Sequence, residues 1–145
     1  MILPDVNVLV YAFRKDTALH GVTRDLLDPL FAGGTQFGIS PLALSALIRI
    51  TTNTRVFATA SSLDDAFGFC TDVLQLPNCR IVEPSDRHWG IFQRLCVDTG
   101  TRGNTVSDVW YAALAIESGC EWVTFDRDFT RFPGLKCTIL PAANT

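Results

Sequence analysis

The sequence predicts an α/β fold in which a mainly parallel central sheet carries helices on both faces. Short segments of strand character alternate along the chain with longer segments of helical periodicity, and strands separated by helices pair in parallel. Asp5 and Asp126 follow predicted strands, and Asp108 lies at the start of a predicted helix. In open parallel sheets, side chains beyond the carboxyl ends of the strands meet at one edge. The 145 residues contain no repeat or linker, so we predict a single domain over residues 1–145.

The first half of the chain predicts two strands and four helices. Apolar residues recur at the helical period in the helical segments, and Gly33 and Gly34 end the second helix. Pro41 suits the first turn of the third helix. The segment 61–65 (SSLDD) predicts the capped, acidic start of the fourth. We expect strands at residues 2–5 and 37–40, and helices at 7–14, at 17–31, after 40 and after 62.

The second half predicts three strands and two helices. Ser85 and Asp86 are expected to cap the first of these helices. The Ala-rich segment 106–118 predicts the clearest helix of the chain, and Gly119 is expected to end it. We expect the strands at residues 80–83, 121–125 and 138–140.

The three aspartates indicate a site for a divalent cation. Carboxylates that converge without basic partners repel one another, so a cluster of Asp5, Asp108 and Asp126 is best explained by a bound ion. Carboxylate ligands favour Mg²⁺ or Mn²⁺, which activate water and stabilise phosphate oxygens. The sequence therefore indicates metal-dependent hydrolysis of a phosphodiester. We expect Asp5 and Asp108 to hold the main ion and Asp126 to orient water or a second, weaker ion.

Each of these aspartates also has a purely structural explanation. Asp5 fits the N-cap of a helix, and Asp126 and Asp128 fit a turn. Asp108 fits the first turn of a helix, where the helix dipole is expected to keep its carboxylate ionised. Taken together, their matching positions in the predicted topology favour a functional site.

Two groups of basic residues have alternative explanations that the sequence leaves open. Arg127 and Arg131 could contact phosphate, or they could pair with Asp128 at the surface. The polar segment 51–55, with Arg49 nearby, fits either a plain loop or an edge that faces RNA.

The histidines and tryptophans are expected to have structural roles. His20 and His88 lack the spacing of metal ligands and have no nucleophile motif beside them, so we expect them at the surface or packed between helices. The tryptophans are expected in the core or at an interface and not as platforms for base stacking; they are Trp89, Trp110 and Trp122.

Composition limits the possible environments and partners. The net charge of −3 argues against a general basic surface for nucleic acid. With 48% hydrophobic and only 19% charged residues, some apolar surface is expected to be covered by a partner or a second copy. Five cysteines without CxxC spacing indicate neither a disulfide framework nor a zinc site. We expect no signal peptide, no membrane span and a cytoplasmic location.

Three segments, in this order, resemble the motifs of PIN domains. Residues 4–9 (PDVNVL) resemble the first motif, residues 104–115 (NTVSDVWYAALA) the central helix with its aspartate, and residues 124–132 (TFDRDFTRF) the closing motif. The resemblance covers nearly the whole chain. It is strongest to the VapC-type toxins of bacterial toxin–antitoxin pairs, particularly the mycobacterial kind.

This resemblance implies a PIN-like, three-layer α/β/α fold and a Mg²⁺- or Mn²⁺-dependent endoribonuclease that cuts RNA, often tRNA or rRNA. Asp5, Asp108 and Asp126 would form the acidic site. Asn7 would brace Asp5 or a water on the ion, and Asp128 would support the cluster. Toxins of this kind form homodimers and are silenced by a VapB-type antitoxin.

One position departs from the pattern of the family. Many PIN domains carry a glutamate on the helix after the second strand, where Ala46 stands in this chain. No acidic residue occurs between Asp28 and Asp64 to replace it. The alternative interpretation is therefore a catalytically weakened module that binds RNA or a partner. A phosphatase that forms an aspartyl-phosphate is a weaker alternative, because Asn7 stands where its second acid is needed.

Overall fold

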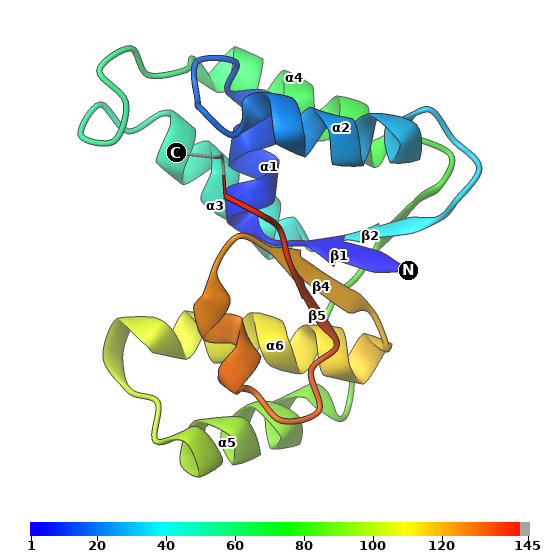
Figure 1. Ribbon diagram of the computed structural model, residues 1–145, viewed down its shortest axis with the longest axis vertical. Helices are drawn as coiled ribbons and strands as arrows, with labels where there is room; N and C mark the ends of the chain where they lie inside the picture. Colours follow the sequence, from blue (N-terminus) through cyan, green and yellow to red (C-terminus); the bar gives the residue numbers. More distant parts are fainter. Residues whose placement is uncertain (143–145) are drawn as a thin grey trace.

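The computed structural model describes residues 1–142 and has a parallel sheet at its centre (Figure 1). Strand β1 pairs with β4, β4 with β5, and β2 with β3, all in parallel. The hydrogen-bonded order is β1-β4-β5 in a three-stranded part, and the β2-β3 pair lies beside β1. The last three residues of the predicted domain, 143–145, lie outside the described residues. The strands are β1 (Ile2–Pro4), β2 (Phe37–Ile39), β3 (Cys79–Ile81), β4 (Glu121–Thr124) and β5 (Cys137–Ile139).

Helices form a layer on each side of this sheet (Figure 1). Helices α1 to α4 lie on one side, and α5 and α6 lie on the other. The predicted three-layer α/β/α architecture is therefore confirmed. The helices are α1 (Val6–Phe13), α2 (His20–Phe31), α3 (Pro41–Thr51), α4 (Leu63–Leu74), α5 (His88–Thr99) and α6 (Val106–Ser118), with short 3₁₀ turns at Gly103–Thr105 and Arg127–Arg131.

Several helix ends lie where the sequence predicts them. The Ser40 hydroxyl accepts from the Ala43 backbone N–H at the start of α3. The Ser62 hydroxyl accepts from Asp65 at the start of α4, so both helices have side-chain N-caps. Helix α6 has the predicted bounds and ends at Gly119, whose φ of 70° places it in the left-handed region that favours glycine.

The start of α5 differs from the prediction. Neither Ser85 nor Asp86 caps this helix, which begins at His88 without a side-chain N-cap. The Glu117 carboxylate at the end of α6 instead accepts from the backbone N–H groups of Ser85 and Arg87, at 2.7 and 2.8 Å. This carboxylate takes the role of a cap from a distant part of the chain and ties α5 to α6.

A close approach of backbone explains the glycine in β2. A Cβ on Gly38 would lie 2.8 Å from Val82 Cγ2 and 3.3 Å from Leu3 Cδ1. Leu3 in β1 is fully buried. Glycine at position 38 therefore lets β2 lie against the central strand, whose carboxyl end carries Asp5.

The sequence predicts neither a disulfide framework nor a membrane span. All five cysteines are free thiols, and Cys70 and Cys120 are buried among apolar side chains. Within residues 1–142, no helix is both long and apolar enough to cross a membrane.

Candidate active site

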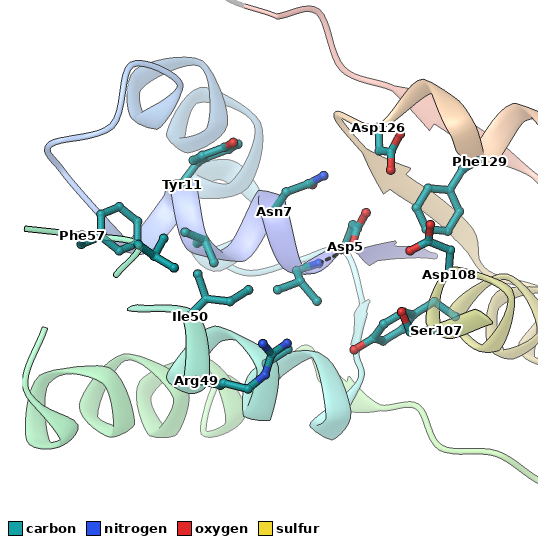
Figure 2. Close-up of a pocket in the computed structure, with 15 residues that line it drawn as sticks. Asp5, Asn7, Tyr11, Arg49, Ile50, Phe57, Ser107, Asp108, Asp126 and Phe129 are labelled. Carbon is teal, nitrogen blue, oxygen red and sulfur yellow. Dashed lines mark hydrogen bonds between the residues drawn. The ribbon is translucent and has the colours of Figure 1, made fainter. Parts of the chain in front are cut away.

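Asp5, Asp108 and Asp126 line one open pocket of about 420 Å³ (Figure 2). Asp5 directly follows β1, and Asp126 lies two residues beyond β4. These strands are parallel neighbours with Pro4 opposite Val123, so their carboxyl ends coincide. Asp108 reaches the pocket from the first turn of α6, on the opposite face of the sheet from α1. The structure thus brings together the three residues that the sequence singles out.

Asp5 is a helix cap and a buried acid at the same time. One carboxylate oxygen accepts from the Val6 backbone N–H, and the other accepts from the Thr124 hydroxyl at 2.6 Å. Only 7% of the residue is exposed. The pKa of Asp5 is raised from 3.8 to about 6, chiefly by burial and in smaller part by the charges of Asp108 and Asp126, against the two hydrogen bonds. Asp5 is therefore held in an environment that disfavours its own negative charge.

The Thr124 hydroxyl connects the residues of this site. It donates to Asp5 and accepts from the Asn7 amide at 3.3 Å and from the Asp126 backbone N–H at 2.9 Å. Asn7 Oδ1 also accepts from the Phe125 backbone N–H at 3.4 Å. Among the described contacts, Asn7 reaches Asp5 through Thr124 and not directly. Sequence reasoning missed Thr124, because a threonine in a predicted strand usually indicates only β propensity.

We expect Thr124→Val to weaken both the fold and the activity. The change keeps the shape but leaves the Asn7 amide and the Asp126 N–H without their acceptor, and we expect a loss of about 2 kcal/mol in unfolding free energy. Because the hydroxyl orients groups behind the acidic side chains, cleavage of RNA should fall by about 10–100-fold. Urea denaturation and an RNA cleavage assay measure the two effects.

Thr23→Val is the matched control, because Thr23 is also fully buried but donates to a single acceptor, Leu19 O, away from the pocket. It should lose stability and keep full activity. Wild-type cleavage by Thr124→Val would show that the hydroxyl has no part in the site.

The environment of Asp108 acts on its pKa in both directions. Its pKa is raised, first by burial and then by the charge of Asp126, while Arg131 lowers it. Burial and a like charge thus act against the ionised form of this carboxyl. Tyr111, one turn further along α6, lines the same pocket, and burial together with Asp5 raises the pKa of its phenol to about 12.

Asp128 and the nearby arginines lie beside the pocket. The Asp128 backbone N–H donates to Asp126 at 2.9 Å, and the charge of its carboxylate contributes to the raised pKa of Asp108. Arg131 donates to the Asp128 backbone carbonyl and lies over the Phe132 ring. Within residues 1–142, neither Arg127 nor Arg131 forms an ion pair with Asp128. The surface salt bridge considered for these residues is therefore absent there.

Ala46 and Arg49 bring α3 into the wall of the pocket, and Figure 2 shows the Arg49 side chain extending from that helix. Ala46 brings no carboxylate to this wall. Arg49 follows one turn later and is the single basic residue among the fifteen described residues that line the pocket. The part of α3 that lines the pocket therefore carries a cation and no carboxylate.

The donor set suits a hydrated divalent cation. The ion pairs among residues 1–142 are Arg14–Asp16 and Arg24–Asp28, so the three pocket aspartates have no cationic partner within that range. In the same part of the chain, no three acidic, histidine or cysteine side chains stand close enough to enclose a bare ion. Mg²⁺ keeps several of its waters and needs only one or two carboxylates. The residues therefore fit an ion held partly through water.

Comparisons with known proteins agree with this arrangement. The chain matches the PIN domain family over residues 2–135. It is 38% identical to ribonuclease VapC43 of Mycobacterium tuberculosis over 136 residues, covering 94% of this chain and 92% of that relative. Similar solved structures include VapBC2 of Rickettsia felis bound to a promoter DNA fragment (TM-score 0.70, 20% identity, 96% and 98% of the two chains). Another is VapC20 of Mycobacterium tuberculosis, a sarcin-ricin loop cleaving toxin (TM-score 0.68, 15% identity, 94% and 99%). The chain therefore belongs to the PIN-domain family and, within it, to the VapC ribonucleases.

Proposed function

We propose that the protein is a toxin of a toxin–antitoxin pair that cleaves RNA as an endoribonuclease dependent on Mg²⁺ or Mn²⁺. The observation that carries this proposal is the clustering of three carboxylates without cationic partners at the carboxyl end of the sheet. The relatives' names identify them as ribonucleases. The pocket disfavours the negative charge of Asp5 and Asp108, because burial first, and neighbouring carboxylates to a smaller extent, raise their pKa values. A bound cation would relieve that charge.

Asp5, Asp108 and Asp126 would hold the cation. When bound, a divalent cation supplies positive charge that stabilises phosphate oxygens and favours ionisation of water. The residues of the chain position these ligands: Thr124 fixes Asp5 and the backbone of Asp126, and Asn7 fixes Thr124. Asp128 would support the cluster through its backbone N–H to Asp126.

The substrate and partners follow from the relatives. We infer that the substrate is a structured RNA, tRNA or rRNA, because a toxin of similar fold cleaves the sarcin-ricin loop. A VapB-type antitoxin is the expected protein partner, because similar structures are VapBC complexes. A homodimer and a cytoplasmic location stay predictions. The alternative of a non-catalytic binding module is not favoured, since the relatives are ribonucleases over almost the full length of the chain.

Incubation of purified protein with total bacterial RNA tests the proposal. With Mg²⁺ or Mn²⁺ we expect discrete fragments, and with EDTA we expect intact RNA. Asp108→Asn should abolish the fragments, because it removes a ligand while keeping the shape of the side chain. Exposed Asp98→Asn on α5 serves as the control for removal of one negative charge and should cleave like the wild type. Metal-independent cleavage, or full activity of Asp108→Asn, would contradict the assignment.

A further inference from the structure

A second pocket opens directly beside the acidic one. It has a volume of about 410 Å³, within the ~300–1,000 Å³ range of small-ligand sites. The two pockets share four lining residues, Ala46, Arg49, Ser107 and Tyr111. The two pockets are therefore contiguous along this wall. We call the second one the aromatic pocket, because the remainder of its lining includes the rings of Phe92 and Trp110.

The two rings are held in place from behind. His88 is only 3% exposed, lies parallel to Phe92 with 6.1 Å between ring centroids, and packs on Trp110 at 4.7 Å. Its Nε2 lies 3.0 Å from the Trp110 backbone carbonyl. Phe92 and Trp110 are themselves half-buried. Phe92 and Trp110 therefore keep part of their aromatic surface open to solvent. The buried His88 behind them limits rearrangement of the two rings.

Arg49 stands on the border between the two pockets. Its side chain extends from α3 into the acidic pocket (Figure 2). Within residues 1–142 it forms no ion pair, although three aspartates line the same pocket. A guanidinium with unused donors is a good ligand for a phosphate group. The pocket thus combines carboxylates that could bind a cation with the Arg49 guanidinium, which could bind a phosphate. This combination suits a phosphodiester.

The overall charge favours RNA binding through local contacts over general attraction to phosphate. At a net charge of −3, general attraction to phosphate cannot supply the affinity. Proteins that recognise unpaired RNA gain affinity by stacking bases on aromatic side chains. The aromatic pocket adjoins the acidic pocket and offers such stacking together with a cation, Arg49, at its rim.

We propose that the aromatic pocket binds an unstacked nucleobase of the RNA next to the scissile phosphate, while Arg49 binds the phosphate between that base and the cut. This inference rests on the proposed function. It adds a subsite beside the acidic pocket and names its ligand, an unstacked nucleobase of the RNA. It also replaces the expectation that Trp110 has no part in stacking.

The test measures RNA binding apart from cleavage. An eight-nucleotide, fluorescein-labelled single-stranded RNA is titrated with protein in EDTA, and its anisotropy is followed at several salt concentrations. We expect Phe92→Leu to weaken binding about five- to hundredfold without changing the salt dependence. Ser45→Phe, which fills the pocket from an exposed position on α3, should do the same. Arg49→Gln should weaken binding and make the slope of log K against log salt shallower by about 0.7, whereas Arg49→Lys should keep the slope.

Val97→Ser is the matched control. Val97 lies on α5 like Phe92, is 73% exposed and lines neither pocket, so this variant should bind RNA like the wild type. Sedimentation of each variant is measured in parallel, because a second copy of the chain could occupy the apolar pocket instead.

Three outcomes would overturn the inference. They are absence of RNA binding by the wild type, unchanged binding by folded Phe92→Leu and Ser45→Phe, and conversion of a dimer to a monomer by these variants with unchanged RNA affinity. The proposed function fails separately: a wild type that binds RNA through Phe92 but never cleaves it with Mg²⁺ or Mn²⁺ would retain the subsite and lose the nuclease.

Discussion

Replacing Asp5 with asparagine is expected to abolish RNA cleavage and, at pH 7 to 8, to stabilise the metal-free protein. Burial is the main reason that the pKa of Asp5 rises from 3.8 to about 6 on folding. A change of this size corresponds to about 3 kcal/mol that the ionised carboxylate costs the fold. Asparagine fills the same space without the charge, so this cost disappears.

Hydrogen bonding reduces the gain. The Thr124 hydroxyl now donates to Asp5 and already accepts from Asn7 and Asp126. An asparagine can accept either from Thr124 or from the Val6 N–H, but its amide nitrogen finds no free acceptor on Thr124. One buried bond is therefore lost, at a cost of about 1 kcal/mol. The net stabilisation should be about 1–2 kcal/mol.

The dependence on pH identifies the cause. Because the folded-state pKa is raised, the wild type keeps the contribution of protonated Asp5 below pH 3.8 and loses it as the pH rises through about 6. Its stability advantage over Asp5→Asn at pH 4 should therefore turn into a disadvantage above pH 6. Urea denaturation between pH 4 and 8 measures this change.

Two comparisons complete the experiment. Asp72→Asn, an exposed substitution on α4, removes one charge outside the site and should leave the difference from the wild type independent of pH. Saturating Mg²⁺ should raise the stability of the wild type, by about 2.7 kcal/mol at a hundred times its dissociation constant, and not that of Asp5→Asn. A destabilised Asp5→Asn at pH 8 without metal would mean that the cap, and not the charge, dominates at this position.

The fold could be predicted wherever local signals agreed with the tertiary structure. Helix α6 has the predicted bounds because its Ala-rich segment ends at a glycine that adopts a left-handed conformation. The start of α5 could not be predicted, because its backbone N–H groups are bound by Glu117, about thirty residues further along the chain. Such a cap depends on how α5 and α6 pack against each other. The residues around Ser85 and Asp86 carry no information about that packing.

The site divides in the same way. The positions of Asp5 and Asp126 followed from their places at the ends of parallel strands. The raised pKa of Asp108 could not be predicted from the sequence. It depends on burial and on the charge of Asp126, and these side chains meet only in the folded protein. The central role of Thr124 was hidden for a related reason: a threonine in a strand usually signals only β propensity.

Replacing Ala46 with glutamate is expected to strengthen the metal site. Ala46 lines the acidic pocket, and the part of α3 that lines it carries no carboxylate. Position 46 on α3 is half-buried, and the side chain of a glutamate there would extend into the pocket. Loss of an outer-shell partner typically lowers metal affinity 10–100-fold, so gain of a ligand should tighten Mg²⁺ binding by about tenfold or more. Calorimetric titration with Mg²⁺ and RNA cleavage at limiting Mg²⁺ measure the effect.

Arg49 sets the limits of this gain. It lies three residues after Ala46 on the same face of α3, so a glutamate at 46 can pair with it. Without metal, repulsion from Asp5 and Asp108 should make Ala46→Glu less stable than the wild type. Pairing of the glutamate with Arg49 should reduce this loss of stability. Ala46→Gln has the same shape without the charge and should leave Mg²⁺ affinity unchanged. Equal affinities of the glutamate and glutamine variants would show that the cation binds away from α3, on the side of Asp126.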